Sequence, residues 1–251
     1  MKLKDAGGVR AVALAALLFG VTAFAWLGVV RSAATMMPMP EMEPLSIAGM
    51  LGFTLQWGVM MTAMMLPSAA PMILLYNGAL HRRIESGERV IPSEAFAFTY
   101  VTLWLLTGVP VYLVWVGVAE LAARSTAFAA AIPYAVAATL VATGLYQLSP
   151  AKHACLRECQ SPVDFLMRRW RSGYLASLRL AITHAAYCIG CCWVLMVLLV
   201  VAGAMSLPWV LAIALVVFAE KVLPGGGRTA RITGTALIVA GVTIFALGPG
   251  S

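Results

Sequence analysis

The sequence has few charged residues. Only 11% of its 251 residues are Asp, Glu, Lys or Arg, whereas soluble domains average about 25%. So few charges could not cover a water-exposed surface, and 62% of the residues are hydrophobic. This composition excludes an ordinary cytosolic enzyme, a disordered chain and a disulfide-stapled secreted miniprotein. An integral membrane protein remains.

Long stretches without Asp, Glu, Lys or Arg mark the membrane spans, because a spanning helix needs about 20 apolar residues. The stretch 44–80 contains Pro67 and Pro71, so we expect one helix there, kinked or broken near Pro67, with a tail toward Leu80. The sequence therefore predicts one all-α domain over 1–251, a polytopic transmembrane helical bundle. It predicts about seven spans, with six as the alternative, at 11–30, 46–66, 95–119, 128–149, 176–203, 208–223 and 232–248.

The basic residues predict the orientation of these spans. With the N-terminus in the cytoplasm, 15 of the 17 Lys and Arg residues fall in cytoplasmic segments, and only Arg31 and Arg124 fall outside. Membrane proteins concentrate Lys and Arg in this way, so the net charge of +7 needs no nucleic-acid partner. We expect an outer Met-rich loop at 31–45 and a basic cytoplasmic loop at 151–175. A cleaved signal peptide is the alternative for 11–30, but its apolar run exceeds the roughly 7–15 residues of a signal sequence.

Methionine is concentrated in one part of the chain. Ten of the 14 methionines lie between Met36 and Met72. One group, Met36, Met37, Met39 and Met42, falls in the predicted outer loop. A second group lies in the second span as two i, i+4 pairs on one broad helix face: Met60 with Met64, and Met61 with Met65. Thioether sulfur suits Cu(I), although methionine is also a common packing residue.

The fifth predicted span has a stripe of soft ligands. His184, Cys188, Cys192 and Met196 are spaced four residues apart, so they share one helix face, with Cys191 beside it. Three thiols within five residues, aligned with an imidazole and a thioether, predict a metal site. The alternatives are a redox pair formed by Cys188 and Cys191, or buried cysteines that only pack.

Two further thiols, Cys155 and Cys159, lie in the basic loop at i, i+4 spacing if that segment is helical. Lys152 and Arg157 are close in sequence and should lower the pKa of these thiols. Metal ligands and incidental cysteines on a surface helix are equally consistent with the pattern. At the inner end of the sixth span, Glu220 and Lys221 are interpreted as interface anchors. The alternative is that Glu220 faces the bundle and holds a cation or proton.

These strings resemble a bacterial family of metal-binding integral membrane proteins, some of which are described as copper chaperones for polyphenol oxidase. The resemblance extends from the second span to the sixth. It is carried by Met60-Met61-x-x-Met64-Met65-x-Pro67, Tyr146-Gln147-Leu148-Ser149-Pro150-x-Lys152-x-x-Cys155-Leu156-x-x-Cys159, Cys188, Gly190-Cys191-Cys192-Trp193-x-Leu195-Met196 and Glu220-Lys221. The resemblance implies a copper-related protein of the bacterial inner membrane but little of its mechanism.

Three functions follow as hypotheses. The first is a non-enzymatic protein that handles a soft metal ion, most consistent with Cu(I), for a partner cuproenzyme, a metallochaperone or transport across the lipid bilayer. Its proposed ligands are Cys188, Cys191, Cys192, His184, Met196, Met60, Met61, Met64, Met65, Cys155 and Cys159. It requires Met64 to lie within a few ångströms of Cys188 or Cys192. The second is a membrane thiol oxidoreductase that uses Cys188 and Cys191. The third is an accessory subunit of a larger membrane complex.

Overall fold

The computed structural model describes residues 2–35, 46–201 and 206–248, and within these ranges the chain forms helices and no strands. Six segments of the described chain are long and apolar enough to cross a membrane. The expected all-α, polytopic bundle is therefore confirmed. The six segments are Gly8–Ala33, Ile47–Leu80, Ser93–Arg124, Thr126–Leu148, Tyr174–Val201 and Gly226–Leu247.

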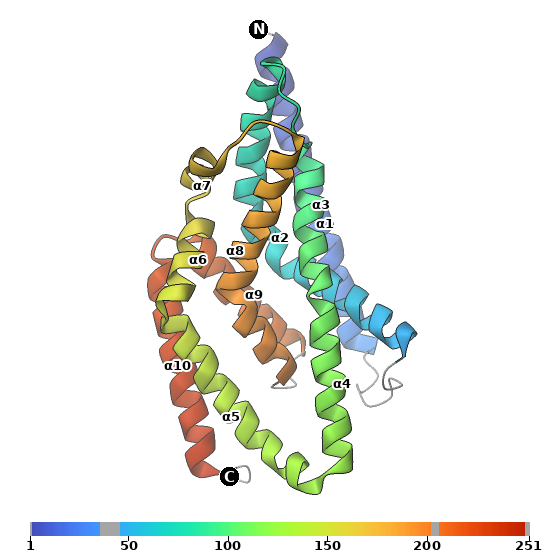
Figure 1. The fold of residues 1–251 in the computed structure, drawn as a ribbon, viewed down its shortest axis with the longest axis vertical. Helices are drawn as coiled ribbons and strands as arrows, with labels where there is room; N and C mark the ends of the chain where they lie inside the picture. Colours follow the sequence, from blue (N-terminus) through green and yellow to red (C-terminus); the bar gives the residue numbers. More distant parts are fainter. Residues whose placement is uncertain (1, 36–45, 202–205, 249–251) are drawn as a thin grey trace.

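Figure 1 shows the helices in chain order, with long helices alternating in direction and two short helices, α6 and α7, between α5 and α8. Their bounds are α1 (Lys2–Thr35), α2 (Ile47–Glu85), α3 (Ser93–Leu106), α4 (Gly108–Arg124), α5 (Thr126–Leu148), α6 (Pro150–Gln160), α7 (Pro162–Arg169), α8 (Tyr174–Val201), α9 (Leu207–Val222) and α10 (Gly226–Leu247). The predicted outer loop with Met36, Met37, Met39 and Met42 falls mainly on 36–45, outside the described residues.

Serine caps fix where several helices begin. The Ser46 side chain accepts a hydrogen bond from the Gly49 amide at the start of α2, and Ser125 accepts one from Phe128 at the start of α5. Ser149 does the same for α6, accepting from the Lys152 amide, with Pro150 in the first turn. Proline is tolerated there because the first-turn N–H has no intrahelical acceptor. The Ser-Pro pair therefore ends α5 and starts α6 in a new direction.

The second predicted span is a single helix that continues through both prolines. α2 contains Pro67 and Pro71 and runs on to Glu85, and Figure 1 shows it changing direction along its length. The carbonyl of Met65 lies two residues before Pro67. It accepts hydrogen bonds from the Ser68 hydroxyl at 2.9 Å and from the Tyr100 hydroxyl at 3.3 Å. Two side-chain hydroxyls thus bond to the backbone next to the proline.

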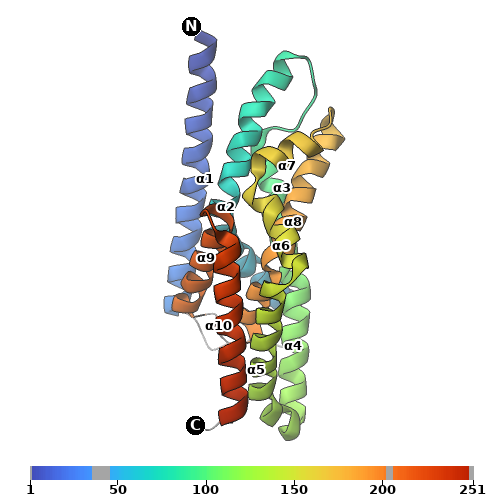
Figure 2. The ribbon, with the colours of Figure 1, turned by 90° about the vertical axis from the view of Figure 1, so that its left-hand side faces the viewer.

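The seventh predicted span, 208–223, corresponds to α9, which is shorter than the six candidate spans. Its 16 residues give a length of about 24 Å at 1.5 Å per residue, less than the ~30 Å hydrocarbon core. The described chain therefore has six candidate spans, the alternative count. Figures 1 and 2 show that α9 still runs opposite to α8 and α10, so the helix directions alternate.

The bundle has two parts. α5 and α10 lie side by side in both views and make extensive contact. α8 lies among α3, α6 and α9, and α2 contacts α3 and α9. The fully buried cysteines and most buried methionines belong to this second group, in one continuous apolar core. The structure thus places the soft-ligand side chains where five helices meet.

Candidate metal centre

The soft-ligand stripe of α8 faces inward. Cys191 and Cys192 are fully buried, and Cys188, His184 and Met196 are each at most 4% exposed. All five cysteines are free thiols. The spacing of four residues therefore predicted a shared buried face correctly, and the face points into the bundle rather than toward lipid.

Met65 of α2 contacts this face. The Sδ atom of Met65 is 3.9 Å from the Sγ atom of Cys192, although the two residues are 127 positions apart. The expectation named Met64 as the neighbour. Met60, Met61 and Met64 are buried in the same core, so the expected proximity of Met64 to Cys188 or Cys192 stays a prediction. The fold therefore brings a thioether and a thiol together from two helices.

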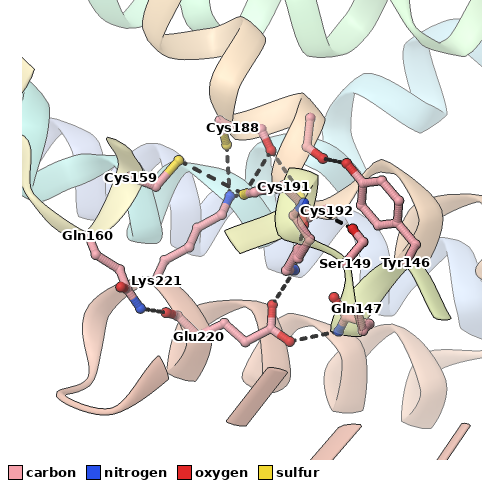
Figure 3. Close-up of polar contacts among 12 residues, drawn as sticks. Tyr146, Gln147, Ser149, Cys159, Gln160, Cys188, Cys191, Cys192, Glu220 and Lys221 are labelled. Atoms are coloured by element: carbon pink, nitrogen blue, oxygen red, sulfur yellow. Dashed lines mark hydrogen bonds and ion pairs between the residues drawn. The ribbon is translucent and has the colours of Figure 1, made fainter. Parts of the chain in front are cut away.

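A lysine of α9 completes the group. Lys221 Nζ lies 2.8 Å from Cys188 Sγ, and 3.7 Å from both Cys192 Sγ and Met65 Sδ. The Tyr100 hydroxyl of α3 is 2.8 Å from the same Cys188 Sγ. We call Met65, Cys188, Cys192, Lys221 and Tyr100 the sulfur cluster. Its members come from α2, α3, α8 and α9, and Figure 3 shows Lys221 reaching the cysteines from below α8.

A buried ion network lies beside the sulfur cluster. Glu220 accepts hydrogen bonds from Lys152 Nζ at 2.6 Å and from Gln147 Nε2 at 2.7 Å. Its backbone carbonyl accepts one from Gln160 Nε2 at 2.6 Å, and Lys152 Nζ also donates to the carbonyl of Cys191. Figure 3 shows Glu220 of α9 between Gln147 of α5 and Gln160 of α6. We call Gln147, Lys152, Gln160 and Glu220 the α6–α9 ion network.

The interpretation of Glu220 and Lys221 as interface anchors is wrong. The structure buries both, at 1% and 5% exposure. Anchoring is the common role of such residues at the end of an apolar helix. Here α9 ends inside the bundle against α6, so its last turn is enclosed by protein. Lys152 and Tyr100 were not expected at the site either. The available signal was the position of Lys152, next to the apolar stretch that precedes α6.

The buried charges do not cancel among themselves. Of the Asp, Glu, Lys and Arg side chains described, those buried are Lys152, Glu220 and Lys221. Lys152 pairs with Glu220, which leaves the ammonium of Lys221. Its nearest partner is the Cys188 sulfur. A buried cation needs a counter-charge, and a thiolate at Cys188 would supply one. The site is therefore suited to thiolate ligation.

The thiols of α6 pack directly against α8. Cys159 Sγ lies 3.9 Å from Cys191 Sγ. A Cβ atom added at Gly190 would lie 3.1 Å from Cys155 Sγ, so this glycine lets α6 approach α8 closely. The segment 150–160 is helical, which puts both thiols on the face toward α8. Cys191 thus contacts the thiol of Cys159 on another helix, and it also interacts with Cys188, its C-x-x-C neighbour, to whose carbonyl it donates a hydrogen bond at 3.2 Å.

The pKa expectation for these two thiols is wrong in sign. Burial raises the pKa of Cys155 above its ordinary value, and the nearby charge of Lys152 lowers it by less. Hydrogen bonding with Cys188 and Cys191, followed by burial, raises the pKa of Cys159 well above its ordinary value. The basic side chains do not dominate, because α6 is packed against the bundle rather than solvated.

His184 lies one helical turn from Cys188 in an aromatic environment. Its ring is 5.8 Å from that of Tyr100, 5.5 Å from that of Phe165 and 6.1 Å from that of Phe96, centroid to centroid. Neither ring nitrogen has a hydrogen-bond partner among the described residues. Both nitrogens are therefore buried without a hydrogen bond next to the sulfur cluster, and a ligand role for His184 stays a prediction.

The donor set favours a soft ion of low coordination number. Within the described ranges, no group of three or more His, Cys, Asp or Glu side chains is placed to hold a metal. Structural zinc requires four such ligands. Two thiols and a thioether instead match Cu(I), which prefers soft sulfur. Fold and site together define a helical membrane protein with a buried sulfur cluster.

Comparison with known proteins agrees with this class. A family model described as copper chaperone, PpoB2, matches residues 54–244. The protein belongs to this copper chaperone family. The matched range contains the whole sulfur cluster and the α6–α9 ion network. No curated protein and no solved structure matches the chain significantly.

Proposed function

We propose that this protein binds Cu(I) at the sulfur cluster and hands it to a copper-requiring partner enzyme. The observation that carries the proposal is the 3.9 Å contact between Met65 and Cys192, because it joins the two sequence groups with soft-ligand character. Cys188 and Cys192 would be the thiolate ligands and Met65 the thioether ligand. Family membership supports copper handling in general.

Charge balance supports a role for Lys221 in this site. Cu(I) held by two thiolates carries one net negative charge, and such a charge is costly inside a bundle. The ammonium of Lys221 lies within 3.7 Å of both thiols and would neutralise it. Lys221 would thus act as a positioned counter-charge rather than a ligand.

The α6 thiols offer a route out of the site. Cys191 lies beside the cluster on α8, and its sulfur is 3.9 Å from that of Cys159. Cys155 follows one turn earlier on the same face of α6. Several sulfur ligands along a path allow an ion to move between sites of moderate affinity, whereas a single high-affinity site would retain it. We propose that Cu(I) passes between the cluster and α6 along these thiols.

The location follows from the charge distribution. Six candidate spans support a membrane protein. The concentration of Lys and Arg in the segments between alternate spans supports an N-terminus in the cytoplasm. We propose the bacterial inner membrane as the location, because the sequence resembles a bacterial family. In this orientation α6 and α7 belong to the cytoplasmic half. This orientation places Ser86 and Ser125 on opposite sides of the membrane. Labelling a single cysteine engineered at each position in intact cells would test it.

The test is anaerobic Cu(I) titration of the purified full chain against a chromogenic Cu(I) chelator. We expect near-stoichiometric copper in the wild type and loss in Cys188→Ser/Cys192→Ser. A matched pair controls for folding: Met65→Leu and Met72→Leu both alter a buried methionine of α2, and leucine has a similar volume. Weaker binding in the first variant alone supports the proposal. Equal effects in both would contradict a ligand role for Met65.

Delivery and transport are separated by a second measurement. The copper-loaded protein in sealed proteoliposomes is mixed with a copper-free polyphenol oxidase as a probe acceptor, and copper is followed inside and outside the vesicles. Activation of the acceptor without copper crossing the membrane supports delivery. Copper crossing the membrane without an acceptor supports transport. A chain that takes up no copper but cycles a dithiol would instead be an oxidoreductase.

A further inference from the structure

A cleft lined by arginines lies where α7 meets α8, away from the sulfur cluster. It has a volume of about 890 Å³. Four arginines line it, two from α7 and two from the start of α8 and the segment before it: Arg168, Arg169, Arg171 and Arg179. Leu175 and Thr183 are among its other lining residues. The copper proposal uses none of these residues.

The cleft has more positive than negative charge. Two carboxylates, one from α6 and one from α7, pair with arginines that line it. Glu158 pairs with Arg168 at 3.1 Å and with Arg169 at 3.5 Å, and Asp164 pairs with Arg168 at 2.8 Å. The remaining two, Arg171 and Arg179, are exposed and have no acidic partner among the described residues. The cleft is therefore left with two uncompensated guanidinium groups.

The first turn of α8 adds to this field. Leu175 and Ala176 line the cleft, and the Ser177 amide bonds back to the Gly173 carbonyl. The backbone N–H groups before Ser177 lie in the first turn of a 28-residue helix, where they have no carbonyl acceptor within the helix. Such a terminus carries a partial positive charge and presents N–H donors to an anion. Two arginines and a helix start thus converge on one space.

The surroundings of the cleft distinguish a lipid from a free anion. Leu175 and Leu180 line it together with Ala176, and Leu175 is 77% exposed, next to Tyr174 at 57%. α8 becomes a candidate membrane span from Tyr174 onward. A soluble anion would gain nothing from this apolar rim. A phospholipid would place its phosphate among the arginines and its acyl chains along the apolar side chains.

We infer that this cleft binds the headgroup of an anionic phospholipid. Arg169 lines the cleft and also holds α7 to α8. A lipid phosphate bound in the cleft would therefore stabilise the start of α8. The Arg169 guanidinium donates to the Tyr187 hydroxyl at 2.7 Å and stacks on the rings of Phe165 and Tyr187. The inference is independent of the proposed copper function and concerns a different part of the chain.

The test is native mass spectrometry of the purified full chain with phosphatidylglycerol or phosphatidylcholine, together with a lipid titration. We expect preferential retention of phosphatidylglycerol. Arg171→Gln/Arg179→Gln should weaken its binding at least about tenfold, since each basic residue near an anionic lipid contributes roughly 1 kcal/mol. Unchanged thermal unfolding in phosphatidylcholine would show that the variant is folded.

A matched variant makes the test specific. Arg228 and Arg231 are also exposed, at the start of α10, but do not line the cleft. Arg228→Gln/Arg231→Gln should leave phosphatidylglycerol binding unchanged. Equal loss in both double variants would overturn the inference in favour of general surface charge. Equal retention of the two lipids would also overturn it, as would displacement of the lipid by millimolar inorganic phosphate or by an acidic peptide.

Discussion

The α5–α10 pair and the region around α8 pack in opposite ways. In the pair, glycines let the backbones touch. A Cβ atom added at Gly144 would lie 2.5 Å from the Gly234 carbonyl oxygen, and one at Gly241 would lie 2.7 Å from the Ala137 carbonyl oxygen. Around α8, side chains fill the space with sulfur, ammonium and carboxylate groups. Small residues are the usual means of holding membrane helices together, whereas buried polar groups are costly and mark function.

The comparison predicts that the largest loss of stability follows from breaking the α6–α9 ion network. Glu220→Ala leaves Lys152 buried without its partner, and we expect a loss of about 3–5 kcal/mol in the free energy of unfolding. Chemical unfolding in detergent measures it. The control is Glu120→Ala, which removes the exposed pair with Arg124 and should change the free energy by less than about 1 kcal/mol. Similar losses in both would show that the network contributes no more than a surface pair.

The next effect concerns the glycine-packed pair. Gly144→Ile places a branched side chain against the backbone of α10, and we expect a cost of about 1–3 kcal/mol from overpacking. Gly117→Ile on α4 has open space around its Cβ position and is the control. Thermal unfolding measures both. Copper bound per folded chain should stay at the wild-type level in Gly144→Ile, and its loss would mean that the two regions are not independent.

Lys221→Leu sharpens the functional side of the comparison. It removes the counter-charge without adding a new sulfur ligand beside the cluster. We expect at least about tenfold weaker Cu(I) binding, equivalent to 1.4 kcal/mol, because the bis-thiolate complex would be buried with a net charge. Chelator competition measures it, with the exposed Arg231→Leu as control. Tighter binding in Lys221→Leu would show that the ammonium competes with the ion instead.

The smallest effect is a pH shift at the edge of the α8 region. Burial raises the pKa of Cys155 above its ordinary value of 9.0. The thiolate is the reactive form, so its alkylation by iodoacetamide should still be rising at pH 9 in the folded protein. Mass spectrometry of the Cys155 peptide gives the rate, and the unfolded chain is the reference. If the pH midpoint of Cys155 alkylation were lower in the folded protein than in the unfolded chain, the positive charges of Lys152 and Arg157 would outweigh burial in setting the pKa of this thiol.

The sequence was sufficient for features that depend on periodicity. Charge-free stretches located the spans, and four-residue spacing placed Cys188 and Cys192 on one buried face. It could not show that Met65 contacts Cys192, because the rotation of α2 about its axis depends on how the helices pack. Nor could it pair Lys152 with Glu220. These residues are 68 positions apart, and each alone is typical of a membrane-interface anchor.

The ligand set of the bound ion tests the central claim most directly. X-ray absorption at the copper edge of the anaerobically loaded full chain reports the oxidation state and the first coordination shell. We predict Cu(I) with a shell of sulfur atoms only, and fewer sulfurs in Cys188→Ser/Cys192→Ser. A shell dominated by nitrogen or oxygen, or a sulfur shell unchanged in that variant, would contradict a copper site at Met65, Cys188 and Cys192.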